Sequence, residues 1–164
     1  MDVRLLFGLS ILFSFIAFGV VSRLYIWPAL QFLDRNRALR ALVVPHTFRF
    51  VGLSFLVPGV VAPTLSRGFA APAAYGDLIA LILALIATFA LSKNVSWAVP
   101  VVWIFNIWGT ADFLFAFYQG MIAQIDFGSL GAAFYIPTVL VPAGLVLHAM
   151  IFMLLVRPTA KLQA

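Results

Sequence analysis

The chain has 164 residues, of which 65% are hydrophobic and only 9% are charged, and its mean hydropathy is +1.14. A water-soluble domain needs far more charge to cover its surface, so the composition excludes a soluble globular protein and indicates an integral membrane protein. The formal net charge of +5 indicates no nucleic-acid partner, because the basic residues flank apolar runs. Cysteine is absent, which excludes disulfides and thiolate chemistry.

Five apolar runs are each about as long as the roughly 20 residues that an α-helix needs to cross a bilayer. Proline, glycine, asparagine or charged residues separate these runs. We therefore predict an all-α bundle of five transmembrane helices that forms one polytopic domain over residues 1–164. The predicted spans are approximately 5–27, 41–61, 75–92, 97–118 and 132–156.

Two further features of the chain qualify this pattern. Residues 29–40 have the alternation of apolar and basic residues that is typical of a short interfacial helix, or equally of a basic stop signal between two spans. Prolines such as Pro45 and Pro142 remove backbone donors, so we expect kinks in the second and fifth spans.

The distribution of basic residues predicts the orientation, because cytoplasmic loops carry an excess of lysine and arginine. With the N-terminus outside, the outer side holds only Arg4 and Arg67. The cytoplasmic side then holds Arg23, Arg35, Arg37, Arg40, Lys93, Arg157 and Lys161. We predict an external N-terminus and a cytoplasmic C-terminus, in a multi-pass protein of the bacterial cytoplasmic membrane. The bilayer is then its partner, and a homo-oligomer or a membrane-complex partner stays open.

Ionisable side chains within the spans are the main candidates for function, since each costs at least a few kcal/mol in hydrocarbon. His46 and Arg49 lie on one side of the second span, roughly 8 and 12 Å from a start at Ala41. His148 lies roughly 12 Å from the cytoplasmic end of the fifth span. The two histidines are therefore expected at comparable depth in the cytoplasmic leaflet, unless the second span begins at Pro45.

Two imidazoles on facing helices can ligate haem iron from both sides. His46 and His148 are therefore metal ligands only if haem is present, and haem b is the one cofactor that the sequence raises. Alternatively, each histidine bonds a backbone carbonyl freed by Pro142 or a neighbouring hydroxyl, or His46 contacts headgroups. A zinc site is not expected, because two histidines fall short of the three or four ligands that zinc needs.

The acidic residues are expected to lie apart from the histidines. Asp112 is placed roughly 22 Å along the fourth span and so in the outer half, where it could pair with Asp77. Asp77 follows Gly76 and is expected to cap the start of the third span. With no acid at its depth, Arg49 is expected to snorkel to the interface or to bind a lipid phosphate, a quinone oxygen or a haem propionate.

Three classes of function remain open, and none of them assigns a catalytic residue. The first is a non-catalytic subunit or binding protein that holds a lipid-like, quinone-like or prosthetic ligand. Its candidate ligand-binding residues are His46, Arg49, His148, Asn106, Asp112 and Trp103. The second is a small b-type cytochrome for membrane electron transfer. The third is an oligomeric transporter of small solutes or ions with Asp112 and Asn106 along the path. An enzyme is not favoured, because the chain has no glutamate and no serine or threonine with an evident base.

Overall fold

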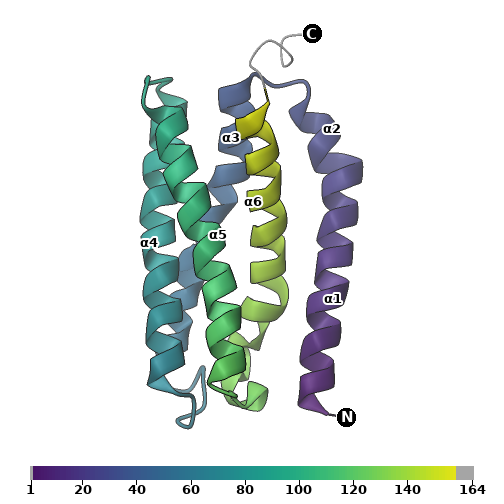
Figure 1. The fold of residues 1–164 in the computed structure, drawn as a ribbon, viewed down its shortest axis with the longest axis vertical. Helices are drawn as coiled ribbons and strands as arrows, with labels where there is room; N and C mark the ends of the chain where they lie inside the picture. The colour runs from purple at the N-terminus through teal and green to yellow at the C-terminus, as the bar shows by residue number, and fades with distance from the viewer. Residues whose placement is uncertain (1, 158–164) are drawn as a thin grey trace.

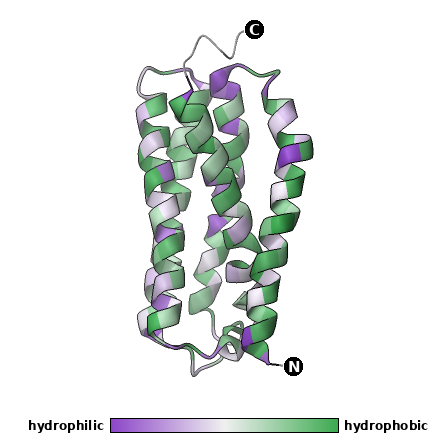
Figure 2. Cartoon of the chain, turned by 45° about the vertical axis from the view of Figure 1, so that its right-hand side comes forward, coloured by the Kyte–Doolittle hydropathy of each residue, from purple (hydrophilic) through white to green (hydrophobic). Residues whose placement is uncertain are grey.

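The structure is a computed structural model that describes residues 2–157. The prediction of five helices long and apolar enough to cross a membrane is confirmed for these residues, which form no β-sheet. The five helical stretches are Val3–Leu30, Arg35–Leu56, Arg67–Ser92, Ala98–Ile122 and Ile136–Val156. Figure 2 shows apolar residues over most of the helical surface, with hydrophilic residues mainly near the ends and at a few positions between them.

Several of these stretches combine different kinds of helix. The first consists of α1 (Val3–Val21), the π-helix η1 (Ser22–Ile26) and α2 (Trp27–Leu30). The second consists of α3 (Arg35–Val43) and the 3-10 helix η2 (Val44–Leu56). The third and fourth are α4 (Arg67–Ser92) and α5 (Ala98–Ile122). The 3-10 helix η3 (Phe127–Phe134) then leads to the π-helix η4 (Ile136–Leu140) and α6 (Val141–Val156).

Four of the five stretches form a compact bundle, and the first lies at its edge (Figure 1). Helix α4 packs against α3, η2 and α5, while α6 packs against α3 and α5. Helix α1 packs on α6, η3 and η4. The start of α1 and the end of α6 lie at opposite ends of the bundle, as an odd number of spans requires.

The basic residues are segregated as the sequence pattern suggested. Arg35, Arg37 and Arg40 of α3, Lys93 after α4 and Arg157 after α6 lie at the end of the bundle where α6 finishes. Arg4 and Arg67 begin helices at the opposite end. Lys161, which was counted with the first group, lies outside the described residues.

The second and third helical stretches begin earlier than expected. Each begins at a polar cap: Asp34 accepts a hydrogen bond from the Arg37 amide at 3.0 Å, and Ser66 accepts one from the Gly68 amide at 3.2 Å. The second stretch therefore runs over 35–56 instead of 41–61, and the third over 67–92 instead of 75–92. Of the two interpretations of residues 29–40, the continuous interfacial helix is not formed, because these residues belong to α2, a short turn and α3.

The expected proline distortions take two forms. Pro45 stands at the start of η2 and has no N–H to continue the α-helical ladder, and the chain changes there to 3-10 geometry. Pro137 lies in the π-helix η4, next to Pro142 at the start of α6. A 3-10 helix seldom runs beyond three or four residues, whereas η2 has 13, so its neighbours in the bundle must hold it.

Two apolar clusters fill the bundle. The cluster towards the end of α6 includes the fully buried Ala84, Ala87 and Ala90 of α4, whose small side chains let helices approach closely. The cluster towards the start of α1 is rich in phenylalanine, with Phe55, Phe69 and Phe113 buried. The ionisable residues of the bundle lie between these clusters.

Gly131 provides a test of the turn between α5 and α6. Its backbone has φ +53° and ψ −131°, a conformation that is essentially restricted to glycine, and a Cβ would overlap the carbonyl oxygen of Val60. We expect Gly131→Ala to lower the free energy of unfolding by about 1–3 kcal/mol, measured by denaturant unfolding in mild detergent. Gly19→Ala is the control, because a Cβ there meets no atom within 4 Å; equal effects of the two changes would contradict this reading.

Candidate functional site

The centre of the site is Arg49 of η2, which is paired with two aspartates. Its Nε donates to Asp77 Oδ1 of α4 at 2.7 Å, and its Nη2 donates to Asp112 Oδ2 of α5. Its Nη1 donates to the carbonyl oxygen of Gly109 at 3.2 Å, and the guanidinium carbon lies 3.7 Å from the centroid of the Phe113 ring. Arg49 is 7% exposed and Asp77 is 6% exposed, so both are buried, whereas Asp112 is partly buried, with 11% of its side chain exposed. We call Arg49, Asp77 and Asp112 the charged triad.

The triad corrects the expected depth of Arg49. From Arg35, nine residues of α-helix and five of 3-10 helix place Arg49 about 23 Å along its stretch, at about 1.5 and 2.0 Å per residue. Asp112 lies about 21 Å from the start of α5 by the same rise. The prediction that Arg49 has no acid at its depth was therefore wrong, because the helix begins earlier and is more extended than a pure α-helix from Ala41.

Asp77 also differs from its predicted role. Helix α4 begins at Arg67 and is capped by Ser66, so Asp77 lies in the third turn and does not cap a helix start. Together with Asp112 it binds Arg49. The prediction that the aspartates lie apart from the polar residues of the cytoplasmic side was also wrong, since Arg49, one of those residues, binds both aspartates.

Glycines allow the charged side chains to lie between closely packed helices. A Cβ added at Gly52 of η2 would overlap the carboxylate of Asp77, and one at Gly76 of α4 would overlap that of Asp112. A Cβ at Gly109 of α5 would lie 2.6 Å from the ring of His148 and 3.0 Å from Nη1 of Arg49. The absence of side chains at these positions is what makes room for the triad.

The two histidines lie next to each other beside the triad. The ring centroids of His46 and His148 are 4.1 Å apart, with an angle of 38° between the rings. Nδ1 of His148 is 2.6 Å from Oδ1 of Asn106, whose Nδ2 donates to the His148 carbonyl oxygen at 3.2 Å. With this amide orientation Nδ1 carries the proton. Nε2 of His148 and Nε2 of His46 are buried without a hydrogen-bond partner among residues 2–157.

This pair does not fit the predicted haem ligation. In a bis-histidine centre the two nitrogens alone are about 4 Å apart, since each metal–nitrogen bond is about 2 Å, and the porphyrin lies between the rings. Here the ring centroids themselves are 4.1 Å apart, which leaves no room for a macrocycle. Residues 2–157 also contain no group of three histidine, aspartate or glutamate side chains that could hold a metal ion.

The structure separates Trp103 from the other candidate residues. Asn106 is fully buried and joins α5 to His148 of α6. Trp103 lies one turn earlier, where its ring centroid is 5.7 Å from that of Phe152 and it packs against the apolar cluster. Trp103 is therefore a packing residue and lies outside the site.

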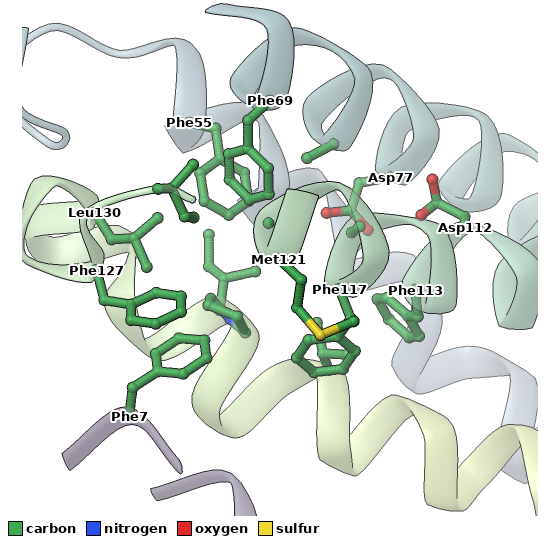
Figure 3. A pocket seen from close by; sticks show the side chains of 17 residues that line it. Phe7, Phe55, Phe69, Asp77, Asp112, Phe113, Phe117, Met121, Phe127 and Leu130 are labelled. Atoms are coloured by element: carbon green, nitrogen blue, oxygen red, sulfur yellow. The ribbon is translucent and has the colours of Figure 1, made fainter. Parts of the chain in front are cut away.

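A narrow apolar pocket begins at the triad and extends towards the start of α1 (Figure 3). Its volume is about 70 Å³. Asp77 and Asp112 lie at one end, and Phe7 of α1, stacked on Phe127 at 3.9 Å, lies at the other. The phenylalanines that line it are Phe7, Phe55, Phe69, Phe113, Phe117 and Phe127. Apart from the abundance of phenylalanine, nothing in the sequence indicated this pocket, because its lining comes from separate elements.

Two further cavities share the aspartates. A groove of about 570 Å³ between α4 and α5 is lined by Asp112 together with Tyr75, Trp108 and Phe115, whose rings are exposed on the outer surface of the bundle. A cavity of about 150 Å³ between η2 and α6 is lined by Asp77, Arg49 and His46. Asp112 therefore borders both the phenylalanine-lined pocket and the groove, and Asp77 borders both that pocket and the cavity between η2 and α6.

The chain belongs to the family described as a domain of unknown function, DUF8737, whose match covers residues 6–156. Among the curated proteins nothing matches the chain, and no solved structure matches it. The matched region contains all five helical stretches except the first three residues of α1.

The triad makes a direct prediction about stability. Arg49→Gln leaves two buried carboxylates without a cation, and we expect it to lower the free energy of unfolding by about 3–5 kcal/mol. Arg37→Gln is the matched control, because Arg37 pairs with Asp34 at the surface with side chains 69% and 56% exposed, and it should cost less than about 1 kcal/mol. Denaturant unfolding in detergent compares them; similar losses would mean that Arg49 is not compensating buried charge.

Proposed function

We propose that this protein is a non-catalytic, membrane-embedded binding protein that holds a lipid-like ligand in the phenylalanine-lined pocket. The observation that carries the proposal is the pocket itself, which is apolar along its length and polar at one end. Binding sites for small molecules commonly combine such an apolar lining with a few polar groups that fix orientation.

The lining of the pocket favours a lipid-like ligand over the two other ligand classes that the sequence left open, because its side chains are apolar except for Asp77 and Asp112 at one end. Its volume of about 70 Å³ is smaller than the cavity of about 150 Å³ that binds benzene, so the pocket would enclose only part of an alkyl chain. A quinone head or a flat prosthetic group is wider than an extended chain and would require the surrounding rings to move further apart.

The proposed ligand lies deeper than the cytoplasmic-leaflet site suggested by the sequence. Asp77 and Asp112 lie near the middle of α4 and α5, so a chain in the pocket would extend from mid-membrane towards the end of the bundle where α1 begins. The segregation of basic residues favours an external N-terminus. The ligand would then lie at the depth of the outer leaflet of a bacterial cytoplasmic membrane.

A transporter is the second candidate, and the position of the triad favours it. Ionisable residues at mid-membrane commonly mark the path of a substrate or proton. Asp112 lies on both the internal pocket and the groove that opens between α4 and α5. A binding protein and a transporter would share this site and differ in whether the occupant crosses the membrane, which flux into proteoliposomes measures.

The binding proposal is tested by filling the pocket. Gly120 lines it, and a Cβ there meets its nearest atoms at 3.6 Å, which is ordinary van der Waals contact. We expect n-decanol to raise the thermal unfolding midpoint of the wild-type protein in mild detergent, and Gly120→Leu to abolish this rise by occupying the space.

Gly19→Leu is the matched control, because it makes the same substitution in α1 where no atom lies within 4 Å of a Cβ. It should respond to decanol as the wild type does. If all three proteins shift by the same amount, decanol acts through the micelle or the outer surface, and the pocket is not a binding site.

A further inference from the structure

The groups that face the pocket at its polar end are carboxylates and not the guanidinium. Asp77 and Asp112 line the pocket, whereas Arg49 does not. The donors of Arg49 bond Asp77, Asp112 and the Gly109 carbonyl oxygen, and its face lies on Phe113. A ligand head at this end therefore meets hydrogen-bond acceptors and finds no free donor of Arg49.

The formal charge of the triad also favours a ligand head that is positively charged. One guanidinium is paired with two carboxylates, so the ionised group carries one negative charge in excess. The other titratable side chains that face it are His46 of η2 and His148 of α6. Excess charge within a membrane is costly unless it is paired, and a cationic head would supply the missing charge.

Aromatic rings stand next to the carboxylates on both sides. Phe113 and Phe117 line the pocket, and Tyr75, Trp108 and Phe115 line the groove with Asp112. Aromatic faces attract ammonium groups, and more strongly where water is excluded. The combination of aromatic rings with a carboxylate is the usual composition of a site for an organic ammonium ion.

The groove gives such a ligand a way in from the bilayer. It lies between α4 and α5, is lined by exposed aromatic side chains and shares Asp112 with the internal pocket. An amphiphile in the lipid phase could bring its head to Asp112 without passing through the rest of the bundle.

From these observations we infer that the ligand is an amphiphilic cation, a linear alkyl ammonium whose head binds Asp112 and Asp77 and whose chain enters the phenylalanine-lined pocket. The inference rests on the proposed binding function and adds the chemical class of the ligand. It excludes fatty acids and phosphate-headed lipids as the main occupants, because their negative heads would face the carboxylates.

Three probes with the same chain and different heads test this inference: n-decylammonium, n-decanol and decanoate. Binding to the purified full-length protein is measured by titration calorimetry at neutral pH and constant ionic strength, in one mild detergent. We expect decylammonium to bind about tenfold more tightly than decanol or better, which is the factor that one charge-assisted hydrogen bond supplies. Decanoate should bind most weakly.

Asp112→Asn should bring the affinity for decylammonium to within about threefold of the affinity for decanol, since the amide keeps the shape of the carboxylate and removes its charge. The triad of this variant still contains the ion pair of Arg49 with Asp77. Asp77→Asn makes the same comparison if the first variant does not fold. Asp34→Asn is the control, because Asp34 is an exposed helix cap and asparagine caps equally well; its preference for decylammonium should be unchanged.

The outcomes separate this inference from the proposed function. Equal binding of decylammonium and decanol, or tighter binding of decanoate, would overturn the cationic ligand and leave the binding function intact. An unchanged preference in both Asp112→Asn and Asp77→Asn would also overturn it. No binding of any probe would overturn the inference and the proposed function together.

Discussion

An arginine buried within a membrane-spanning bundle must be paired, and the structure depends on how Arg49 meets this requirement. Its guanidinium joins η2 to α4 through Asp77, and to α5 through Asp112 and the Gly109 carbonyl oxygen. Breaking such a pair costs much more than forming it gains, because the remaining charge is left uncompensated. The triad therefore specifies how three helices are placed relative to one another, while the apolar clusters on either side supply the packing.

The local backbone and the small residues around the triad serve this arrangement. The 3-10 geometry after Pro45 extends η2 and so carries Arg49 to the depth of Asp112. Gly52 and Gly76 leave space for the carboxylates where the helices meet. The same carboxylates form one end of the phenylalanine-lined pocket. The group that holds the bundle together is thus also the group that a ligand head would meet, and binding and helix packing are expected to be coupled.

The number of helices could be predicted from hydropathy because each apolar run matches the thickness of a bilayer. The starts of α3 and α4 could not be predicted from hydropathy, since they depend on the polar caps Asp34 and Ser66, which lie beyond the apolar runs. The error in the depth of Arg49 followed from that early start and from the 3-10 rise. One signal was available, since Arg49 and the aspartates Asp77 and Asp112 all fall within predicted spans, where opposite charges commonly pair. Comparable depths of His46 and His148 were expected from the sequence, but the contact of their rings depends on side-chain directions that a sequence does not specify.

The most direct test of the triad compares Arg49→Gln with the triple variant Arg49→Gln/Asp77→Asn/Asp112→Asn in denaturant unfolding. The triple variant has the same change at residue 49 but leaves no buried charge without a partner. If charge compensation by Arg49 is what holds η2, α4 and α5 together, the triple variant will be more stable than Arg49→Gln and will recover much of the lost free energy of unfolding. A triple variant that is as unstable as Arg49→Gln, or less stable, would contradict this and would mean that shape and hydrogen bonding, not charge, determine the role of Arg49.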